Sequence, residues 1–268
     1  MTMNIRRIYA VFLRYMILLF GSPQRLMQIL IWGSLDVLLF GFLTKYLNSA
    51  SNSEFGLVPA LLGGIILLDI LMRFQQGTTT PVLEDIWSNN LLNYFASPLR
   101  ISEYIVGLIG SALVTTALAT STMVLLAYFV FGFSLLKLGV PLAGFVAILF
   151  LFGISLGIVG ATIVLRFGPS AEWYVWPMTA VLSPFVGVLY PITVLPVWMQ
   201  TISSMLAPTY VFEGMRSILI SGEFSASHLV IGFILALISV ALASFLFMHA
   251  YRSVVRMGLL ARYSAEGL

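Results

Sequence analysis

Long apolar stretches separated by short polar segments dominate the pattern of this chain. A helix needs about 20 mainly apolar residues to cross the hydrocarbon core of a bilayer, and six stretches approach or exceed that length. The sequence therefore predicts an all-α integral membrane protein with six transmembrane helices in a single domain over residues 1–268. The predicted spans are residues 26–47, 57–74, 102–131, 140–165, 173–194 and 229–251.

The composition agrees with this prediction and excludes other classes of protein. Of the 268 residues, 60% are hydrophobic and only 9% are charged, whereas soluble domains carry about 25% charged residues. The net charge of +3 is small and the arginines are scattered, which argues against a nucleic-acid partner. The chain has no cysteine, so disulfides and thiolate metal sites are excluded.

The first 25 residues have an amphipathic pattern. At helical spacing, apolar side chains gather on one face and arginines on the other, which suits a helix lying in the membrane interface. We expect this interfacial helix within residues 1–25, with a break at Gly21, Ser22 and Pro23 where the chain turns into the bilayer. An ordinary basic flank before the first span is the alternative. The apolar positions are Ile5, Ile8, Phe12 and Met16, and the basic ones are Arg6, Arg7 and Arg14.

Residues 81–98 interrupt the apolar pattern with a segment that is too polar to span a bilayer. Thr80 is a suitable N-cap and Pro81 suits the first helical position, so we expect a separate cytoplasmic helix to begin here and to end at Pro98. This helix either receives mechanical work from a soluble partner or only covers the end of the membrane domain. The candidate coupling residues are Leu83, Glu84, Asp85, Trp87, Asn90 and Tyr94, of which Leu83, Trp87, Asn90 and Tyr94 are expected to form one exposed stripe.

The distribution of basic residues predicts the orientation of the chain. Lys and Arg are enriched in cytoplasmic segments, and most of them fall on one side of the six-span topology. Both termini and the polar helix are therefore expected in the cytoplasm. Arg6, Arg7, Arg14, Arg25, Arg73, Arg100, Arg166, Arg252, Arg256 and Arg262 fall on that side, and Lys45, Lys137 and Arg216 on the other.

The segment between the fifth and sixth predicted spans contains two short apolar pieces within residues 196–220. A proline introduces each piece, and neither is long enough to cross a membrane. They are expected either to dip into the membrane from outside as re-entrant half-helices, where protein covers their backbone, or to lie in an external loop as interfacial helices. Glu213 and Arg216, three residues apart, are expected to pair there, with a possible role as an external gate.

Two carboxylates within the predicted spans are unusual. Asp36 lies in the middle of the first span and Asp69 lies toward the cytoplasmic end of the second. A carboxylate at the bilayer centre costs roughly 3 kcal/mol, so each is expected to face protein or water. Asp36 either lines a pathway or makes a structural hydrogen bond between helices. Asp69 has the further option of pairing with Arg73, one helical turn later.

Small residues recur in the fourth predicted span, where Gly153 and Gly157 have G-x-x-x-G spacing and Gly160 follows. Such spacing favours close helix packing, either within one chain or between two. The sequence contains no catalytic motif that we can defend, because His228 and His249 lie at opposite ends of the last span and no phosphate-binding loop is present. We therefore expect neither a catalytic residue nor a metal site on this chain.

Two segments resemble a known family. EDIWSNNLLNYFASPLRISEY, residues 84–104, resembles the cytoplasmic coupling region of ABC-2 type transporter permeases. SPFVGVLYPITVLPVWMQTISSMLAPTYVFEGMRSIL, residues 183–219, resembles the end of the fifth span and the short re-entrant helices of the same family. The order of elements agrees along essentially the whole chain, so the chain is similar to type V exporters.

The resemblance implies a function. A permease of this family dimerises and binds two copies of an ATP-binding cassette subunit, which holds the ATP and magnesium, in the inner membrane of a bacterium. It exports a hydrophobic or amphipathic molecule such as a drug, a lipid or a lipid-linked glycan. The path runs between the two copies along the first, second and fifth spans, which implies Asp36, Phe40, Phe185 and Tyr190 as candidate lining residues.

Two other functions remain open at the level of the residues. A secondary transporter driven by an ion gradient would use Asp36, although such proteins commonly contain repeated halves and no repeat is visible here. A membrane scaffold without transport activity would recruit a cytoplasmic protein through the helix at Pro81.

Overall fold

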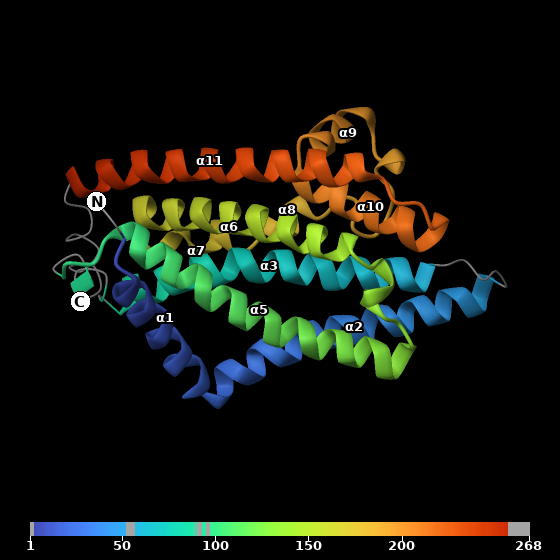
Figure 1. Ribbon diagram of the computed structural model, residues 1–268, viewed down its shortest axis with the longest axis horizontal. Helices are drawn as coiled ribbons and strands as arrows, with labels where there is room; N and C mark the ends of the chain where they lie inside the picture. The colour runs from blue at the N-terminus through green and yellow to red at the C-terminus, as the bar shows by residue number, and fades with distance from the viewer. Residues whose placement is uncertain (1–2, 52–56, 89, 91–92, 95–96, 257–268) are drawn as a thin grey trace.

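The computed structural model describes residues 3–51, 57–88, 90, 93–94 and 97–256, and these residues form helices joined by turns. Among the long helices, α3, α6 and α11 run roughly along one axis, α2 and α5 cross it obliquely, and α1 is steeply inclined to it (Figure 1). They are α1 (Ile5–Phe20), α2 (Pro23–Ser51), α3 (Leu57–Trp87), α5 (Ile101–Phe131), α6 (Pro141–Phe167) and α11 (Ala226–Arg256). The short elements are η1 (Leu135–Leu138), η2 (Pro169–Ala171), α7 (Glu172–Val175), α8 (Met178–Leu182), η3 (Ile192–Val194), α9 (Val197–Ser204) and α10 (Ala207–Ser221).

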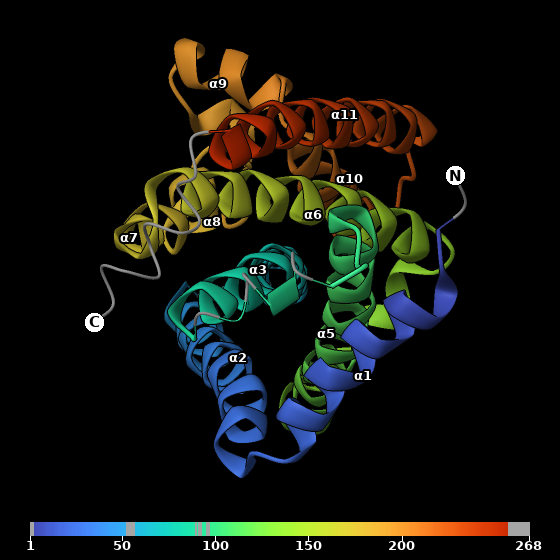
Figure 2. The same cartoon turned by 90° about the vertical axis from the view of Figure 1, so that its left-hand side faces the viewer.

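The helices stack in layers. Figure 2 shows α6 between α11 on one side and α3 and α5 on the other, with α1 and α2 outermost beyond α3 and α5. The largest group of buried apolar side chains lies where α3, α5, α6 and α10 meet. A second group joins the end of α3 to α1, α5 and α6. Helix α3 belongs to both groups and is the central element of the bundle.

Five helices in the described part of the chain are long and apolar enough to cross a membrane, and the expected six continuous spans are therefore not found. The five are Pro23–Leu47, Pro59–Trp87, Ile101–Phe131, Pro141–Phe167 and Ala226–Val254. The expected continuous helix over residues 173–194 is wrong, because this segment folds into the short helices α7 and α8 followed by turns and η3.

Prolines and a glycine explain the break in this segment. Pro177 stands at the N-cap of α8, Pro184 and Pro191 follow it, and Gly187 has a left-handed φ of 70°. Each proline removes a backbone donor and disfavours helix in the residue before it. The apolar composition of residues 173–194 is typical of a transmembrane helix, but the backbone of this segment cannot form one uninterrupted helix.

Polar side chains of α3 hold the near end of the broken segment. The Gln75 Nε2 amide donates to the carbonyl of Val175 at 3.2 Å, and the Thr179 hydroxyl donates to Gln75 Oε1 at 3.0 Å. Gln75 and Thr179 are both buried. Away from water, irregular backbone is tolerated only where protein satisfies its polar groups, and Gln75 supplies such a partner here.

The far end of the broken segment is held by the expected pair on α10. Arg216 Nη1 lies 2.6 Å from Glu213 Oε1, which confirms the pairing. Arg216 also donates to the carbonyl of Gly187 at 2.6 Å, and the amide of Ile192 donates to Glu213 Oε1 at 3.1 Å. The pair therefore fixes the turn between α8 and η3, and a role as an external gate stays a prediction.

The two short helices expected within residues 196–220 are present as α9 and α10. Pro196 is the N-cap of α9, and Pro208 lies in the first turn of α10. Helix α10 packs against α11, α3 and α6, and Phe212 and Met215 on it are fully buried. In Figure 1, α9 protrudes from the bundle beside α10. How deeply either helix enters a membrane stays a prediction.

The helix expected to start at Pro81 is instead the continuation of α3. Pro81 lies inside a helix that runs from residue 57 to residue 87, although an interior proline costs about 3 kcal/mol. Packing on both sides of this stretch explains why the helix continues. A Cβ on Gly77 would lie 2.6 Å from Ala112 Cβ of α5, and a Cβ on Gly157 of α6 would lie 2.6 Å from Thr78 Cβ. Thr80 is therefore not an N-cap, because tertiary contacts outweigh the local signal.

The glycine stripe of α6 packs within the chain. Gly153 lies against Leu71 and Phe74 of α3, and Gly157 and Gly160 lie against Thr78 and Thr79. The Thr79 hydroxyl donates to the carbonyl of Gly157 at 3.1 Å, a bond that a side chain on α6 would obstruct. The stripe thus lets α3 and α6 approach closely. Of the two expected kinds of contact, within one chain or between two, the structure shows the first.

Replacement of Gly157 by alanine tests this contact. Gly157→Ala is expected to lower the free energy of unfolding by about 1–3 kcal/mol, because the new methyl group overpacks against Thr78. Gly110→Ala is the matched control, since its Cβ meets only the Phe12 ring at 3.3 Å and gains the same helix propensity. Thermal unfolding in detergent measures both variants, and equal midpoints would contradict close packing of α3 on α6.

Candidate functional site

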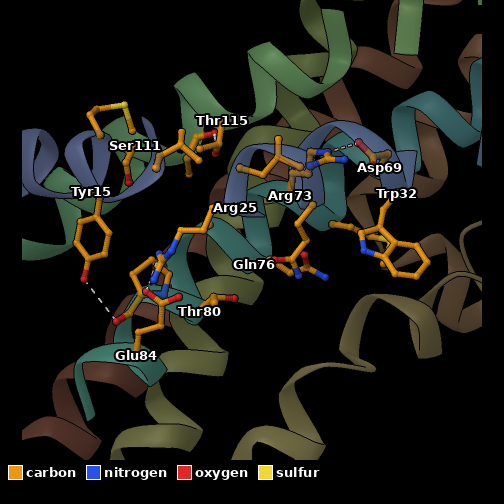
Figure 3. A pocket seen from close by; sticks show the side chains of 18 of the residues that line it. Tyr15, Arg25, Trp32, Asp69, Arg73, Gln76, Thr80, Glu84, Ser111 and Thr115 are labelled. Carbon is orange, nitrogen blue, oxygen red and sulfur yellow. Dashed lines mark hydrogen bonds and ion pairs between the residues drawn. The ribbon is translucent and has the colours of Figure 1, made fainter. Parts of the chain in front are cut away.

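A cavity of about 430 Å³ opens between α1, α2, α3 and α5, with Trp176 also on its wall. It is large enough for a small organic ligand. Figure 3 shows two groups of labelled side chains along it. Tyr15, Arg25, Thr80 and Glu84 lie toward one end, and Trp32, Asp69, Arg73 and Gln76 toward the other.

Helix α2 presents a polar stripe to this cavity. Arg25, Gln28, Trp32 and Asp36 follow one another at intervals of three or four residues, so they share one helical face. Arg25 Nη1 lies 3.1 Å from Glu84 Oε2 of α3. The structure thus places Asp36 on a cavity wall. This position agrees with the interpretation that Asp36 lines a pathway, and not with a structural hydrogen bond between helices.

Helix α3 forms the opposite wall with Asp69, Arg73 and Gln76. Arg73 donates to Asp69, which confirms the expected pairing of the two residues one turn apart. A Cβ on Gly33 of α2 would lie 3.0 Å from Arg73 Nη2 and 3.2 Å from Asp69 Oδ1. Glycine at this position therefore lets the ion pair pack directly against the backbone of α2.

The other residues expected along a translocation path lie elsewhere. Phe40, Phe185 and Tyr190 do not line this cavity. Phe185 packs edge-on against Trp198 with ring centres 6.3 Å apart, and the Tyr190 hydroxyl donates to the carbonyl of Pro184 at 2.9 Å. Of the four candidates, the cavity contains Asp36 alone, and a role of the other three in transport stays a prediction.

A buried polar cluster lies next to the cavity where α1 crosses the end of α3. Its members are Arg14, Tyr15, Asp85, Tyr94 and Tyr104, called the Asp85 cluster below. The hydroxyls of Tyr15 and Tyr104 both donate to Asp85 Oδ2, the latter at 2.6 Å. Arg14 Nη2 lies 2.9 Å from Asp85 Oδ1. The two groups form an ion pair, but their geometry does not meet the angles of a hydrogen bond. Arg14 also donates to the hydroxyl of Tyr94.

The Asp85 cluster combines one acidic and one basic side chain with three phenols. The side chain of Asp85 is only 1% exposed and that of Arg14 is 31% exposed. Burial raises the pKa of Tyr94 to about 12, and the negative charge of Asp85 adds to this effect. Burial and Asp85 also raise the pKa of Tyr15. Both phenols therefore stay protonated at neutral pH, and Tyr15 donates to a carboxylate that Arg14 neutralises.

A second buried carboxylate fixes the start of α1. Glu103 near the start of α5 accepts the backbone amides of Asn4 at 2.9 Å and of Arg100 at 3.0 Å. Arg7 of α1 lies 3.5 Å from the same carboxylate. Helix α1 is therefore attached to the bundle through Glu103 near its first residue and through Asp85 near its last turns.

The comparison with protein families identifies the architecture. The family described as ABC-2 type transporter matches residues 6–220, more than half of the chain. The chain belongs to the ABC-2 type transporter family. It is therefore a multi-pass membrane protein and the permease component of an ABC transporter, whose partner is an ATP-binding cassette subunit. No curated protein matches the chain.

The structure places the candidate coupling residues of this ABC-2 permease differently from the expected exposed stripe. Leu83 is only 1% exposed, so the expectation that it faces outward is wrong, whereas Trp87 is 50% exposed. Asn90 and Tyr94 are half-buried and both helical. Leu83 faces inward because α3 continues through this region and packs there against α1, α5 and α6.

Glu84 and Asp85 also face the protein rather than open solvent. Glu84 pairs with Arg25, and Asp85 belongs to the cluster described above. The six candidate coupling residues thus have two kinds of environment, with Trp87 as the most exposed member and Leu83 and Asp85 as buried members. Their role in coupling stays a prediction.

The sequence does not predict the members of the Asp85 cluster or the role of Glu103. Its pattern places Arg14 on the polar face of an interfacial helix and does not single out Tyr15, Tyr104 or Glu103. Their partners lie up to 99 residues away in the chain, as in the contact of Asn4 with Glu103, and no local pattern reports such a contact. The sequence offers one signal for these contacts, which is the presence of acidic residues at the borders of apolar helices.

Removal of the central carboxylate tests the cluster. Asp85→Ala is expected to reduce the free energy of unfolding by about 3 kcal/mol, because it leaves Arg14 and two phenols without their acceptor. It is also expected to speed hydrogen–deuterium exchange in α1. Glu84→Gln is the control, because it breaks a more exposed pair that is worth less than about 1 kcal/mol. Equal unfolding midpoints and unchanged exchange in α1 would show that the cluster does not hold this helix.

Proposed function

We propose that this permease is the transmembrane subunit of an ATP-driven exporter that moves a hydrophobic or amphipathic molecule out of a bacterial cell. The observation that carries the proposal is the cavity of about 430 Å³ inside a bundle of apolar helices, with five charged side chains on its wall. A membrane subunit that only anchors a partner has no use for charged groups on such a wall, because each one is costly in a bilayer.

The ATP-binding subunit is proposed to dock at the end of the bundle where α1 begins and α11 ends. In Figure 1, the start of α1, the end of α3 and the start of α5 lie at this end. Trp87 is the last residue of α3 and exposes half of its surface. Exposed tryptophans near the centre of an interface commonly contribute most of the binding energy, so Trp87 is the proposed anchor.

The Asp85 cluster is proposed to carry movement from this docking surface to the cavity. It connects α1, α3 and α5, which also form three of the cavity walls. A displacement of the end of α3 by a closing pair of ATP-binding subunits would therefore move α1 with it. Buried ion pairs with several hydrogen bonds resist separation, which suits an element that transmits force.

The proposed location is the bacterial inner membrane, with both termini in the cytoplasm. The asymmetry of basic residues supports this orientation. Arg73 does not belong among the cytoplasmic basic residues, because it lies inside α3 and pairs with Asp69 instead of lying at a helix end. The asymmetry remains strong without it.

The functional assembly is proposed to contain two copies of this chain and two ATP-binding subunits. Broad apolar surfaces on α2, α5 and α11 support this stoichiometry, since a second copy and lipid would together cover them. Their exposed side chains include Trp32 and Phe42 on α2, Phe129 on α5, and Phe245 on α11. Membership of the ABC-2 family favours ATP as the energy source over the gradient-driven transporter that Asp36 alone suggested.

Substitution of the proposed anchor tests the docking surface. Trp87→Ala is expected to reduce co-purification of the ATP-binding subunit at least tenfold, because loss of an interface anchor commonly costs about 2 kcal/mol. Trp198→Ala is the matched control, since this tryptophan is 61% exposed but lies on α9, away from the proposed surface. Quantitative pull-down from mild detergent measures both variants. Retention of the subunit by Trp87→Ala would remove the assigned role, and absence of any ATP-binding subunit from the wild-type complex would remove the exporter proposal.

A further inference from the structure

The charged groups on the cavity wall do not cancel. The wall contains three carboxylates, Asp36, Asp69 and Glu84, and two guanidinium groups, Arg25 and Arg73. Arg25 pairs with Glu84 and Arg73 pairs with Asp69. In the part of the chain that the structure describes, the side chain of Asp36 makes neither an ion pair nor a hydrogen bond to another residue, which leaves one carboxylate of the cavity unmatched.

We propose that the cavity binds an amphipathic organic cation, with its positive charge held between the carboxylate of Asp36 and the indole of Trp32. This assignment names the class of cargo for the exporter proposed above and rests on that function for its role in transport. The binding itself depends only on the cavity.

The position of Trp32 supports a cationic ligand. Trp32 and Asp36 are four residues apart on α2, so they lie one turn apart on the same face. The indole is 65% exposed, and its face can accept a cation that also contacts the carboxylate. Tryptophan is the best aromatic partner for organic cations, and the attraction increases when water is excluded.

The same wall disfavours an anionic ligand. Both guanidinium groups already have carboxylate partners, so an anion would have to displace one of them and would also approach the unmatched Asp36. An unmatched carboxylate within an apolar helix is costly, and a cation offsets that cost, whereas an anion adds to it. The sign of the excess charge therefore selects the sign of the ligand.

The ligand is expected to be organic rather than a metal ion. A divalent metal ion requires several oxygen ligands at once, and the described residues contain no group of three acidic or histidine side chains that could hold one. Apolar side chains, among them Met16, Leu19, Ile29 and Met72, line the rest of the cavity. They provide contacts for the hydrocarbon body of an amphipathic molecule.

Two probe ions of the same shape and opposite charge test the proposal. Tetraphenylphosphonium and tetraphenylborate are measured separately by equilibrium dialysis against the purified full chain in an uncharged detergent, with empty micelles subtracted. The cation is expected to bind saturably and at least about tenfold more tightly than the anion, given the attraction between close charges in a partly dry site. Equal binding of the two ions would overturn the proposal without the need for any variant.

Variants then locate the site. Asp36→Asn keeps the size of the side chain and is expected to weaken binding of tetraphenylphosphonium about tenfold, while Trp32→Leu is expected to weaken it about fivefold. Asp36→Glu restores the charge and is expected to restore most of the affinity. Glu223→Gln is the matched control, because it removes one exposed carboxylate in the turn before α11 and is expected to bind like the wild type.

The outcomes separate this proposal from the proposed function. Wild-type affinity in both Asp36→Asn and Trp32→Leu would place the cation elsewhere and overturn the assignment. Binding of tetraphenylphosphonium through Asp36 in a chain that captures no ATP-binding subunit would support the cavity and remove the exporter. Capture of the subunit without selection of the cation would do the reverse.

Discussion

The absence of water from the interior of a membrane bundle is the constraint on which this structure depends, and it acts most strongly on α3. An unsatisfied polar group in that environment costs several kcal/mol, yet this central helix carries Asp69, Gln75, Thr79 and Asp85. Each has its partner within the protein: Arg73, the carbonyl of Val175, the carbonyl of Gly157, and Arg14 with its tyrosines. The surrounding elements are held in position by these contacts.

The same helix joins the proposed docking surface to the cavity. Its last turns contain Asp85, the centre of the Asp85 cluster, and the exposed Trp87, and its middle forms one wall of the cavity. Close contact with the glycines of α6 keeps α3 continuous through Pro81. A rigid connection between a docking end and a ligand cavity is what an ATP-driven permease requires, because the work of nucleotide binding must reach a site inside the membrane.

Two carboxylates on the cavity wall have contrasting environments. Asp69 and Asp36 lie on the same cavity and within electrostatic range of each other. Asp69 is fixed by Arg73 and packs against Gly33 of α2, so its charge is already used within the fold. Among the described residues, the side chain of Asp36 has no such partner, which is why the proposed cation is placed there.

The sequence by itself determined the membrane class, the family resemblance, five of the six apolar helices, and the pairs Asp69–Arg73 and Glu213–Arg216. These follow from local composition and from spacings of three or four residues, which a helix converts directly into contacts. Only the tertiary structure decided that α3 continues through Pro81, that residues 173–194 do not form one helix, and that Leu83 and Asp85 are buried. The reason is physical, because contacts between Tyr15 and Asp85 or between Gly157 and Thr78 join residues 70 or more positions apart, and their packing energy outweighs the local preference of a proline or a polar side chain.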